Sequence, residues 1–456
     1  MDEKKSTDLT RRNFMGAAAI AGAGVLLTHC GPKPKTYPTL TFVDKAPDGA
    51  PLKAGLIGCG GRGSGAAIDF LKAGPNLQVT ALADVFEDRV RSCREKLAKE
   101  ANVQVADDHC FVGFDAYKRV IDSDVDVVLL ATPPHFRPEH FNAAVDAKKH
   151  VFMEKPVAVD APGVRTVLAA GEKAKPYNLS VVAGTQRRHQ REYLETQNRI
   201  AHGAIGRIVA ARAYWNQSFL WQRPRQRGWS DMEAMLRDWV NWRWLSGDHI
   251  VEQHVHNLDV VAWFTGLYPV KAVGMGGRAR RMTGDQYDFF AVDFAYQNGM
   301  HTMSMCRQVD GCANSVSEYV VGTEGSSNCR NTIYDLDGNP VWKYGEVVPQ
   351  AGQPPAKAEE EEEEEKPKFN PYEQEQVDLV TAIRTNKPIN ETENVAKSTL
   401  MAIMGRTAAY TGTEVTWDQI MSSEERLGPT EYKMGPVAIK AVIPVPGTAP
   451  KAAELA

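Results

Sequence analysis

The stretch LKAGLIGCGGRG, residues 52–63, decides the fold of this chain. Its first half, Leu52 to Ile57, is a short apolar run typical of a buried strand, and residues 64–73 have the spacing of a helix. The loop between them carries three glycines in the pattern G-x-G-x-x-G. This order of strand, loop and helix predicts the first unit of a dinucleotide-binding fold.

Each glycine of the loop has its own task. Gly58 permits a tight turn, Gly60 admits a pyrophosphate close to the backbone, and Gly63 lets the helix pack closely on the strand. Gly61 and Arg62 complete the loop, and we expect them to contact the cofactor as well. The glycine pattern is weak alone and gains weight from its place between a predicted strand and a predicted helix.

A carboxylate follows at the spacing that such a fold requires. Asp84 comes directly after a second predicted strand, residues 77–83, and 21 residues after Gly63. There it would accept hydrogen bonds from the adenosine ribose hydroxyls and repel a ribose phosphate, which favours NAD over NADP. NADP remains an alternative because Arg62 and Arg89 are also present, and arginines can bind a ribose phosphate. The alternative is that Asp84 is only a turn residue at the end of its strand.

Strands and helices continue to alternate over about 130 residues. We predict a charged helix at 87–100, an apolar buried strand at 125–131, a helix at 140–148 and a strand at 150–153. The alternation predicts an α/β Rossmann domain, with a doubly wound parallel sheet, over residues 52–180.

Residues 181–425 show a different pattern, with longer strands and few helices between the later ones. The strands are predicted at 208–215, 270–278, 289–296 and 300–307. This pattern predicts an α+β domain with a mostly antiparallel open sheet.

Several segments connect or flank these domains. Residues 31–51 are a Pro-rich linker, and residues 356–368 contain an acidic run that is most simply a solvated loop. Helices are predicted at 373–384 and 394–410, and residues 426–456 form a tail rich in Pro and Ala.

The first 30 residues have the pattern of a targeting segment. Paired arginines within residues 10–15 precede an apolar stretch, 17–27, that is too short to span a bilayer. The pattern predicts export by the twin-arginine route, hence a periplasmic protein; an ordinary basic start is the alternative. Cys30 would be a lipid-anchored first residue if a lipoprotein signal is cleaved before it, although His29 suits that cleavage poorly.

The composition excludes several classes of partner. The 456 residues include 53 basic and 57 acidic side chains, a formal charge of −4. This balance argues against a nucleic-acid partner or an anionic membrane surface and favours small molecules. The six cysteines after Cys30 lack both metal-type pairing and the density of a disulfide scaffold, so we predict structural thiols and no metal site.

Two motifs end predicted strands at the edge where open parallel sheets place their ligands. The motif TPPH supplies Thr132, Pro133 and His135, although a proline pair is also an ordinary turn. The motif EKP supplies Glu154 and Lys155, 92 residues after the last glycine of the loop. This spacing suggests a lysine delivered to a bound nicotinamide.

A polar stripe forms on a helical wheel that begins at residue 246. Its members are His249, Glu252, His256, Asp259 and Trp263. The simpler interpretation is an amphipathic helix with its polar face in water. The functional interpretation is that His256 accepts a proton while Glu252 orients its partner. His254 falls on the apolar side and is predicted to be a core histidine.

Seven of the nine tryptophans fall between Trp215 and Trp263. Sugar rings present C–H faces that stack on indoles, so the cluster is consistent with a carbohydrate pocket. Packing at a domain interface explains it equally well.

In this order, the glycine loop, Asp84, the Glu-Lys-Pro motif and the Glu252/His256 pair resemble the Gfo/Idh/MocA oxidoreductases over roughly residues 52–419. The resemblance implies a Rossmann domain followed by an open sheet whose outer face builds dimers or tetramers. It implies that Lys155 lies near the nicotinamide and that His256 is the base. Most members carry Asp where this chain has Glu252, which puts the reach of that acid in question.

The resemblance also implies NAD(P)-dependent hydride transfer between a sugar or glycoside hydroxyl, with C3 the expected carbon, and the nicotinamide. His256 would take the hydroxyl proton while Lys155 stabilises alkoxide charge. Since an exported enzyme meets little free cofactor, we expect tight retention and a reaction that regenerates it. The alternatives are NAD-dependent glycoside hydrolysis by oxidation and elimination, as in related N-acetylgalactosaminidases, and non-catalytic binding of a sugar or cofactor.

Overall fold

The computed structural model describes residues 35–348 and 369–448. The predicted export signal with Cys30 and the acidic loop at 356–368 lie outside the described residues. The described residues from Pro38 onward belong to one compact unit. Within the described ranges, no helix combines the length and the apolar character needed to cross a bilayer.

The first sheet has six parallel strands in the order β3-β2-β1-β4-β5-β6. This is the strand order of a doubly wound dinucleotide-binding fold, so the predicted Rossmann domain is confirmed. The strands are β1 (Leu52–Ile57), β2 (Leu77–Asp84), β3 (Cys110–Val112), β4 (Val127–Leu130), β5 (His150–Met153) and β6 (Val181–Ala183).

Helices cover both faces of this sheet because its strands are apolar on both sides. Leu56 and Leu129 pack with α1 (Gly61–Lys72) and α2 (Glu87–Ala101), while Ile57 packs toward the other face. That other face is covered by α3 (Ala116–Ile121), α4 (Arg137–Asp146) and α5 (Ala161–Ala174). Successive side chains of a strand point to opposite faces, so both layers follow from the sequence of the strands.

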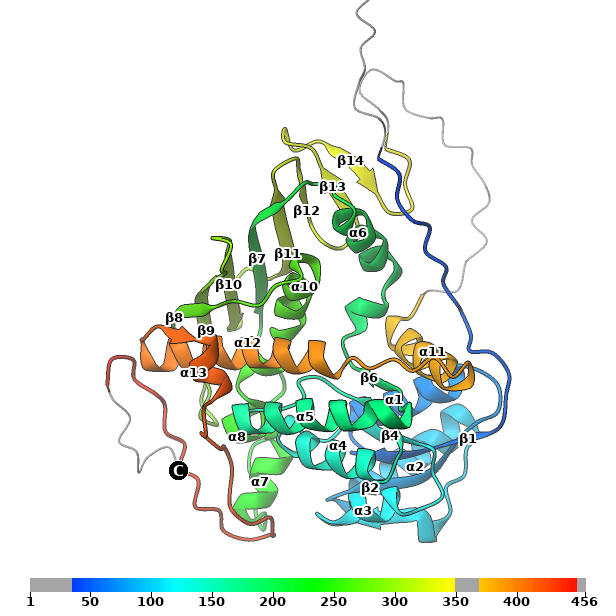
Figure 1. Cartoon of the computed structure of the whole chain (residues 1–456). Helices are drawn as coiled ribbons and strands as arrows, with labels where there is room; N and C mark the ends of the chain where they lie inside the picture. The colour runs from blue at the N-terminus through cyan, green and yellow to red at the C-terminus, as the bar shows by residue number, and fades with distance from the viewer. Residues whose placement is uncertain (1–34, 349–368, 449–456) are drawn as a thin grey trace, which may run out of the picture. The chain divides into compact units, whose positions relative to one another are not determined.

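The first domain uses residues from beyond its predicted boundary at residue 180. Strand β6, Val181–Ala183, is the sixth strand of the parallel sheet. Helix α11 (Pro371–Arg384) returns from far along the chain and packs against α1 (Figure 1). The apolar residues of α11 complete the core on that side, which local sequence patterns do not indicate.

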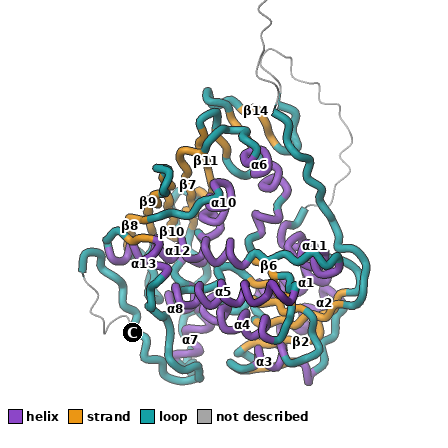
Figure 2. Tube along the Cα trace, in the orientation of Figure 1, coloured by secondary structure: helices purple, strands orange, loops and turns teal. Residues whose placement is uncertain are grey.

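The second sheet has nine strands in the order β14-β13-β12-β11-β7-β10-β9-β8-β15. Only the pair β7 and β10 is parallel, so the predicted mostly antiparallel sheet is confirmed. Figure 2 shows the strands of this sheet gathered in one part of the molecule. The strands are β7 (Ile208–Gln217), β8 (Lys271–Gly277), β9 (Phe289–Ala295), β10 (His301–Gln308), β11 (Ser315–Gly322), β12 (Ser326–Ser327), β13 (Thr332–Tyr334), β14 (Pro340–Lys343) and β15 (Val415–Thr416).

One face of this sheet packs against helices, and the other bears exposed apolar side chains. The packed face contacts α10 (Val255–Thr265) and α12 (Thr392–Thr411). On the other face, Val273, Met275 and Met303 are 51%, 70% and 49% exposed. The remaining helices of this domain are α6 (Arg191–Ala201), α7 (Asp231–Arg237), α8 (Arg243–Ser246), α9 (His249–Glu252) and α13 (Trp417–Met421).

The predicted continuous helix through the polar stripe is wrong. Helix α9 ends at Glu252 and α10 begins at Val255. Between them the His254 N–H donates to the His249 carbonyl, five residues back, at 3.1 Å. This wider turn inserts one extra residue, so the members of the stripe do not share one helix face. The solvent-facing interpretation is also wrong, because His249, Glu252, His256 and Asp259 are all buried.

Candidate functional site

The glycine loop has the close approaches that its sequence predicts. Gly58 has φ +101°, and a Cβ there would lie 2.6 Å from the Ala131 carbonyl carbon. A Cβ on Gly63 would lie 1.8 Å from the Gly58 carbonyl oxygen, so helix α1 meets strand β1 too closely for any side chain. At Gly60 and Gly61 a Cβ would meet nothing within 4 Å. These two glycines therefore leave open space at the start of α1, where a pyrophosphate fits.

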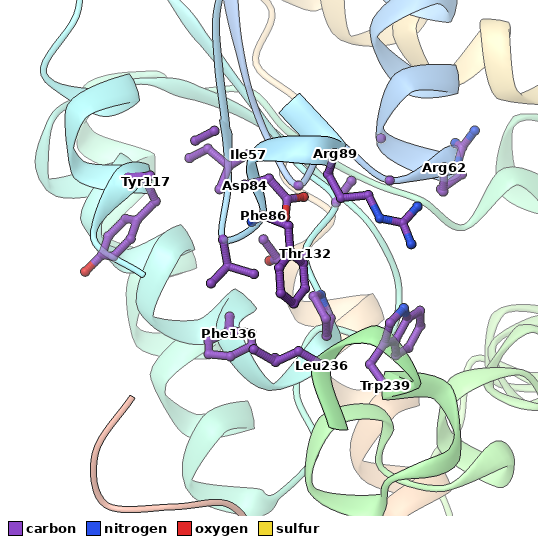
Figure 3. A pocket seen from close by; sticks show the side chains of 18 of the residues that line it. Ile57, Arg62, Asp84, Phe86, Arg89, Tyr117, Thr132, Phe136, Leu236 and Trp239 are labelled. Atoms are coloured by element: carbon purple, nitrogen blue, oxygen red, sulfur yellow. Dashed lines mark hydrogen bonds between the residues drawn. The ribbon is translucent and has the colours of Figure 1, made fainter. Parts of the chain in front are cut away.

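A cavity of about 370 Å³ adjoins this loop (Figure 3). The glycine loop and the carboxyl ends of β2 and β4 form its Rossmann side. From the second domain, Trp221, Leu236 and Trp239 border the same cavity. The open glycines and a carboxylate beside this space fit a dinucleotide, which the residues around Gly58 and Asp84 would hold.

Asp84 borders the cavity and also stabilises the loop. Its carboxylate accepts the backbone N–H groups of Cys59 at 2.8 Å and of Phe86 at 3.0 Å. Burial raises the pKa of Asp84, and those two hydrogen bonds oppose the rise. Each carboxylate oxygen has a second lone pair, so the turn role and the ribose role of Asp84 are compatible.

Arg62 and Glu154 form an ion pair with each other. The Arg62 guanidinium also lies 3.3 Å from the Glu375 carboxylate and stacks over the Tyr372 ring at 4.5 Å. Burial lowers the pKa of Arg62, but Glu154 and Glu375 hold it above its usual value. Although Arg62 borders the cavity, its charge is already paired, and Glu154 does not border the cavity.

The TPPH motif divides between two environments. Thr132 and Pro133 border the cavity, as does His140, which the sequence did not single out. His135 does not; its Nε2 lies 2.7 Å from the Tyr432 hydroxyl and its ring packs edge-on against Trp244. Burial lowers the pKa of His135 to about 4. In this structure His135 is part of an aromatic cluster rather than of the cavity wall.

Lys155 and Glu252 lie together although 97 residues separate them. The Lys155 Nζ donates to the Glu252 backbone carbonyl at 2.5 Å and to its carboxylate at 3.2 Å. The same carboxylate accepts a hydrogen bond from the Gln253 side-chain amide. The longer acid at this position therefore reaches the lysine and fixes its ammonium at the end of β5.

His256 belongs to the same cluster. Burial lowers its pKa well below the usual value, and the positive charges of Lys155, Arg187 and Arg62 lower it further. The imidazole stacks on Trp215 with ring centroids 5.7 Å apart. It has no hydrogen-bond partner within the described part of the chain. A neutral imidazole held by stacking can accept a proton from a bound hydroxyl.

Sequence patterns did not indicate Arg187, which lies close to this cluster in the folded chain. Arg187 stacks over Trp215 at 5.6 Å and pairs with Glu318 at 2.6 Å. The local excess of tryptophans was the only sequence feature that pointed to this region. In the structure the tryptophans have different places: Trp215 stacks on His256, whereas Trp221 and Trp239 border the cavity.

Two minor predictions concern histidine and cysteine. His254 is fully buried, and its Nε2 lies 2.7 Å from the Ser304 hydroxyl, so the predicted core histidine is confirmed. The six cysteines in the described ranges are unpaired. The same ranges contain no group of three His, Cys, Asp or Glu side chains arranged to hold a metal ion.

Comparison with known proteins gives two family matches. The model described as "Oxidoreductase family, NAD-binding Rossmann fold" matches residues 52–181, and that described as "GFO/IDH/MocA C-terminal domain" matches residues 193–328.

Individual relatives match only part of this chain. Inositol 2-dehydrogenase of Salmonella typhimurium is 30% identical over 166 residues, 36% of this chain and 46% of that protein. A glycosyl hydrolase family 109 protein of Solibacter usitatus is 27% identical over 250 residues, 50% of this chain and 51% of that protein. This chain thus spans about half the length of the curated relatives that it matches.

The fold itself recurs in solved structures. The crystal structure of aldose-aldose oxidoreductase from Caulobacter crescentus is similar with a TM-score of 0.61 and 18% identity, over 80% of this chain and 99% of that one. Both domains therefore match the family in sequence and in architecture. The chain belongs to the Gfo/Idh/MocA family of oxidoreductases.

Proposed function

We propose that this protein is an NAD(P)-dependent oxidoreductase that transfers a hydride between a sugar or glycoside hydroxyl, at C3, and a tightly retained nicotinamide cofactor. The observation that carries the proposal is the cluster of Lys155, Glu252 and His256 at the end of β5, one strand away from Thr132 in the cavity wall.

The residues of the cluster have complementary tasks. A bound nicotinamide supplies the hydride acceptor. His256, neutral because its pKa is lowered, takes the proton of the substrate hydroxyl. The Lys155 ammonium, held in place by Glu252, stabilises the negative charge that develops on the oxygen as this proton leaves. Burial of the cluster strengthens that electrostatic stabilisation.

The relatives support a polyhydroxylated substrate, because one is named an inositol 2-dehydrogenase and another a glycosyl hydrolase. The paired arginines of residues 10–15 support export to the periplasm, with Cys30 a candidate lipid anchor. Export in turn favours a retained cofactor, since a freely dissociating one would be lost.

The exposed apolar face of the nine-stranded sheet supports a homodimer or homotetramer. Met275 and Met303 lie on β8 and β10. On β9, the strand between these two, Phe289 is 41% exposed. Isolated apolar residues on a surface are ordinary, but exposed apolar side chains on three adjacent strands favour a partner. A second copy of the chain would bury this patch.

A second candidate function is NAD-dependent glycoside hydrolysis. In that reaction, oxidation at C3 acidifies the neighbouring C–H bond, the aglycone is eliminated, water adds, and the ketone is reduced. The observation that favours it is the glycosyl hydrolase family 109 relative of Solibacter usitatus, which is 27% identical over half of this chain.

One experiment separates these functions. The purified mature protein is denatured and its supernatant assayed for nicotinamide, and the intact protein is incubated with a glycoside panel and followed by NMR. A keto-glycoside supports the oxidoreductase, and free sugar without added cofactor supports the hydrolase. Retained cofactor without any product favours a non-catalytic binding protein. Absence of both, even with NAD or NADP added, would contradict the proposal.

A further inference from the structure

The cavity at the glycine loop is covered by a segment of the second domain. We call residues 218–242 the roof segment; it contains α7 and follows strand β7. Trp221, Leu236 and Trp239 of this segment border the cavity opposite the Rossmann residues, as the labelled Leu236 and Trp239 show in Figure 3. The dinucleotide fold itself does not supply such a wall.

A bidentate ion pair connects the roof segment to the Rossmann domain. The Arg237 guanidinium donates to the two carboxylate oxygens of Asp88 at 3.0 Å and 3.1 Å. It also lies over the Phe86 ring at 3.9 Å. Asp88 is in the first turn of α2, four residues after Asp84. Because Asp84 marks the ribose side of the site, the roof segment covers the adenosine half of the dinucleotide.

The C-terminal tail holds the roof segment from its other side. The Met232 N–H donates to the Gly435 carbonyl at 3.1 Å, and the Val437 N–H donates to the Asp231 carboxylate at 3.3 Å. Val437 also packs with the buried residues of α7. The segment therefore has contacts on both sides. To lift from the cofactor site it would lose its link to Asp88 and the packing of Met235 and Leu236 in one buried cluster with Phe86 and Phe136.

Two positive charges beside the cavity, Arg89 on α2 and Arg223 in the roof segment itself, call for an anionic ligand. Arg89 and Arg223 both border the cavity, and neither guanidinium has a carboxylate partner within hydrogen-bond or ion-pair distance among the described residues. Burial lowers the pKa of Arg223, and the charges of Arg89 and Arg237 lower it further. The positive charge of Arg89 thus acts on Arg223 across the cavity, and an anion bound beside both would offset their repulsion. Cofactor phosphates are such anions.

We propose that the roof segment, latched by Arg237 to Asp88, encloses the adenosine half of the dinucleotide between its own Arg223 and Arg89 of the Rossmann domain, and so retains the cofactor. This inference rests on the proposed nicotinamide chemistry and deepens it, because it names the structure that retains the cofactor. Release of the cofactor would require the latch to open.

The test is the rate at which bound NADH and NADPH leave the protein, measured by fluorescence after mixing with an excess of the oxidised cofactor and without any sugar. Asp88→Asn breaks the latch, and we expect it to raise the dissociation rate at least tenfold. Glu87→Gln is the matched control: it removes a carboxylate from the same first turn of α2 but has no ion pair with Arg237. Its dissociation rate should stay within twofold of wild type.

Two further variants test the reasoning. Arg237→Gln should speed cofactor release as Asp88→Asn does. The double variant should release cofactor no faster than the faster single variant, because both substitutions remove the same Arg237–Asp88 ion pair. Arg223→Gln should speed release of NADPH more than NADH if Arg223 contacts a ribose phosphate, and of both equally if it contacts the pyrophosphate.

The outcomes distinguish this inference from the proposed function. Release within twofold of wild type for both Asp88→Asn and Arg237→Gln would overturn the latch, whatever the enzyme does to sugars. Slow release from wild type with no product from any sugar would overturn only the proposed function. A wild-type protein that binds neither cofactor would overturn both.

Discussion

Replacement of Lys155 by Met should slow turnover strongly while leaving the cofactor bound. Methionine keeps the length and the apolar stem of the side chain but removes the ammonium that lies 3.2 Å from the Glu252 carboxylate. Loss of one preorganised donor to a developing oxyanion typically costs about 10²- to 10³-fold in kcat, roughly 2.7 to 4 kcal/mol. We therefore expect kcat for sugar oxidation to fall at least about 10²-fold.

The same substitution should lower stability, because it leaves the buried Glu252 carboxylate without its cation. Breaking a buried pair from one side costs about 3 to 5 kcal/mol when the remaining charge is uncompensated. The side-chain amide of Gln253 still donates to Glu252, so the lower end applies. Adding Glu252→Gln to Lys155→Met removes the stranded charge and should recover most of that stability without restoring turnover.

The assay combines three measurements: kcat by NMR of the sugar product, retained nicotinamide after denaturation, and the midpoint of urea unfolding. Lys118→Met is the control, since Lys118 forms an exposed ion pair with Asp115 and should change none of them. A kcat within threefold of wild type for Lys155→Met would remove Lys155 from the mechanism. A double variant as unstable as Lys155→Met would show that the lysine does not compensate Glu252.

Three other predictions follow from the geometry. Because the pKa of His256 is held well below 6.5, its imidazole stays neutral as pH falls through 6.5. The value of kcat/KM should therefore stay level near pH 6.5 and decline only at much lower pH. A decline centred near pH 6.5 would contradict this. Gly60→Ala should fold normally but lose NADH affinity in a titration, whereas Gly63→Ala, whose Cβ would meet the Gly58 carbonyl, should also lower the melting temperature. Met303→Glu on the open sheet face should dissociate the oligomer, as measured by analytical ultracentrifugation. Met282→Glu, at a loop position that is 86% exposed, should leave the oligomer intact. An unchanged mass for Met303→Glu would exclude this face as the interface.

Local patterns predicted the first domain closely. The strand at residues 52–57 was placed at its observed bounds, and helix α2 was placed to within one residue, because hydrophobic period and glycine spacing are properties of neighbouring residues. The polar stripe was predicted less well. Its residues do act together, yet the turn at His254 breaks the helix, and nothing in the local sequence, neither Gly nor Pro, marks that break.

The candidate site divides in the same way. The sequence identified Lys155, Glu252 and His256 by residue type and spacing, and the structure brings them together. It could not show that Glu154 pairs with Arg62, or that His135 packs in an aromatic cluster, because each partner is far along the chain. Packing, rather than propensity, selects those contacts.

By itself, the sequence determined that this chain has a dinucleotide loop, a parallel sheet behind it and a Lys–Glu–His set with the chemistry for proton and alkoxide handling. The loop and the sheet follow from side chains within a few residues of one another, where backbone geometry leaves few choices. The Lys–Glu–His set spans about a hundred residues, and the order of its motifs along the chain, which resembles a known family, indicated it. The tertiary structure alone decided that α11 completes the Rossmann core and that residues 218–242 cover the cofactor cavity. Contacts between distant segments depend on the complementary shape and charge of surfaces that exist only after the chain has folded.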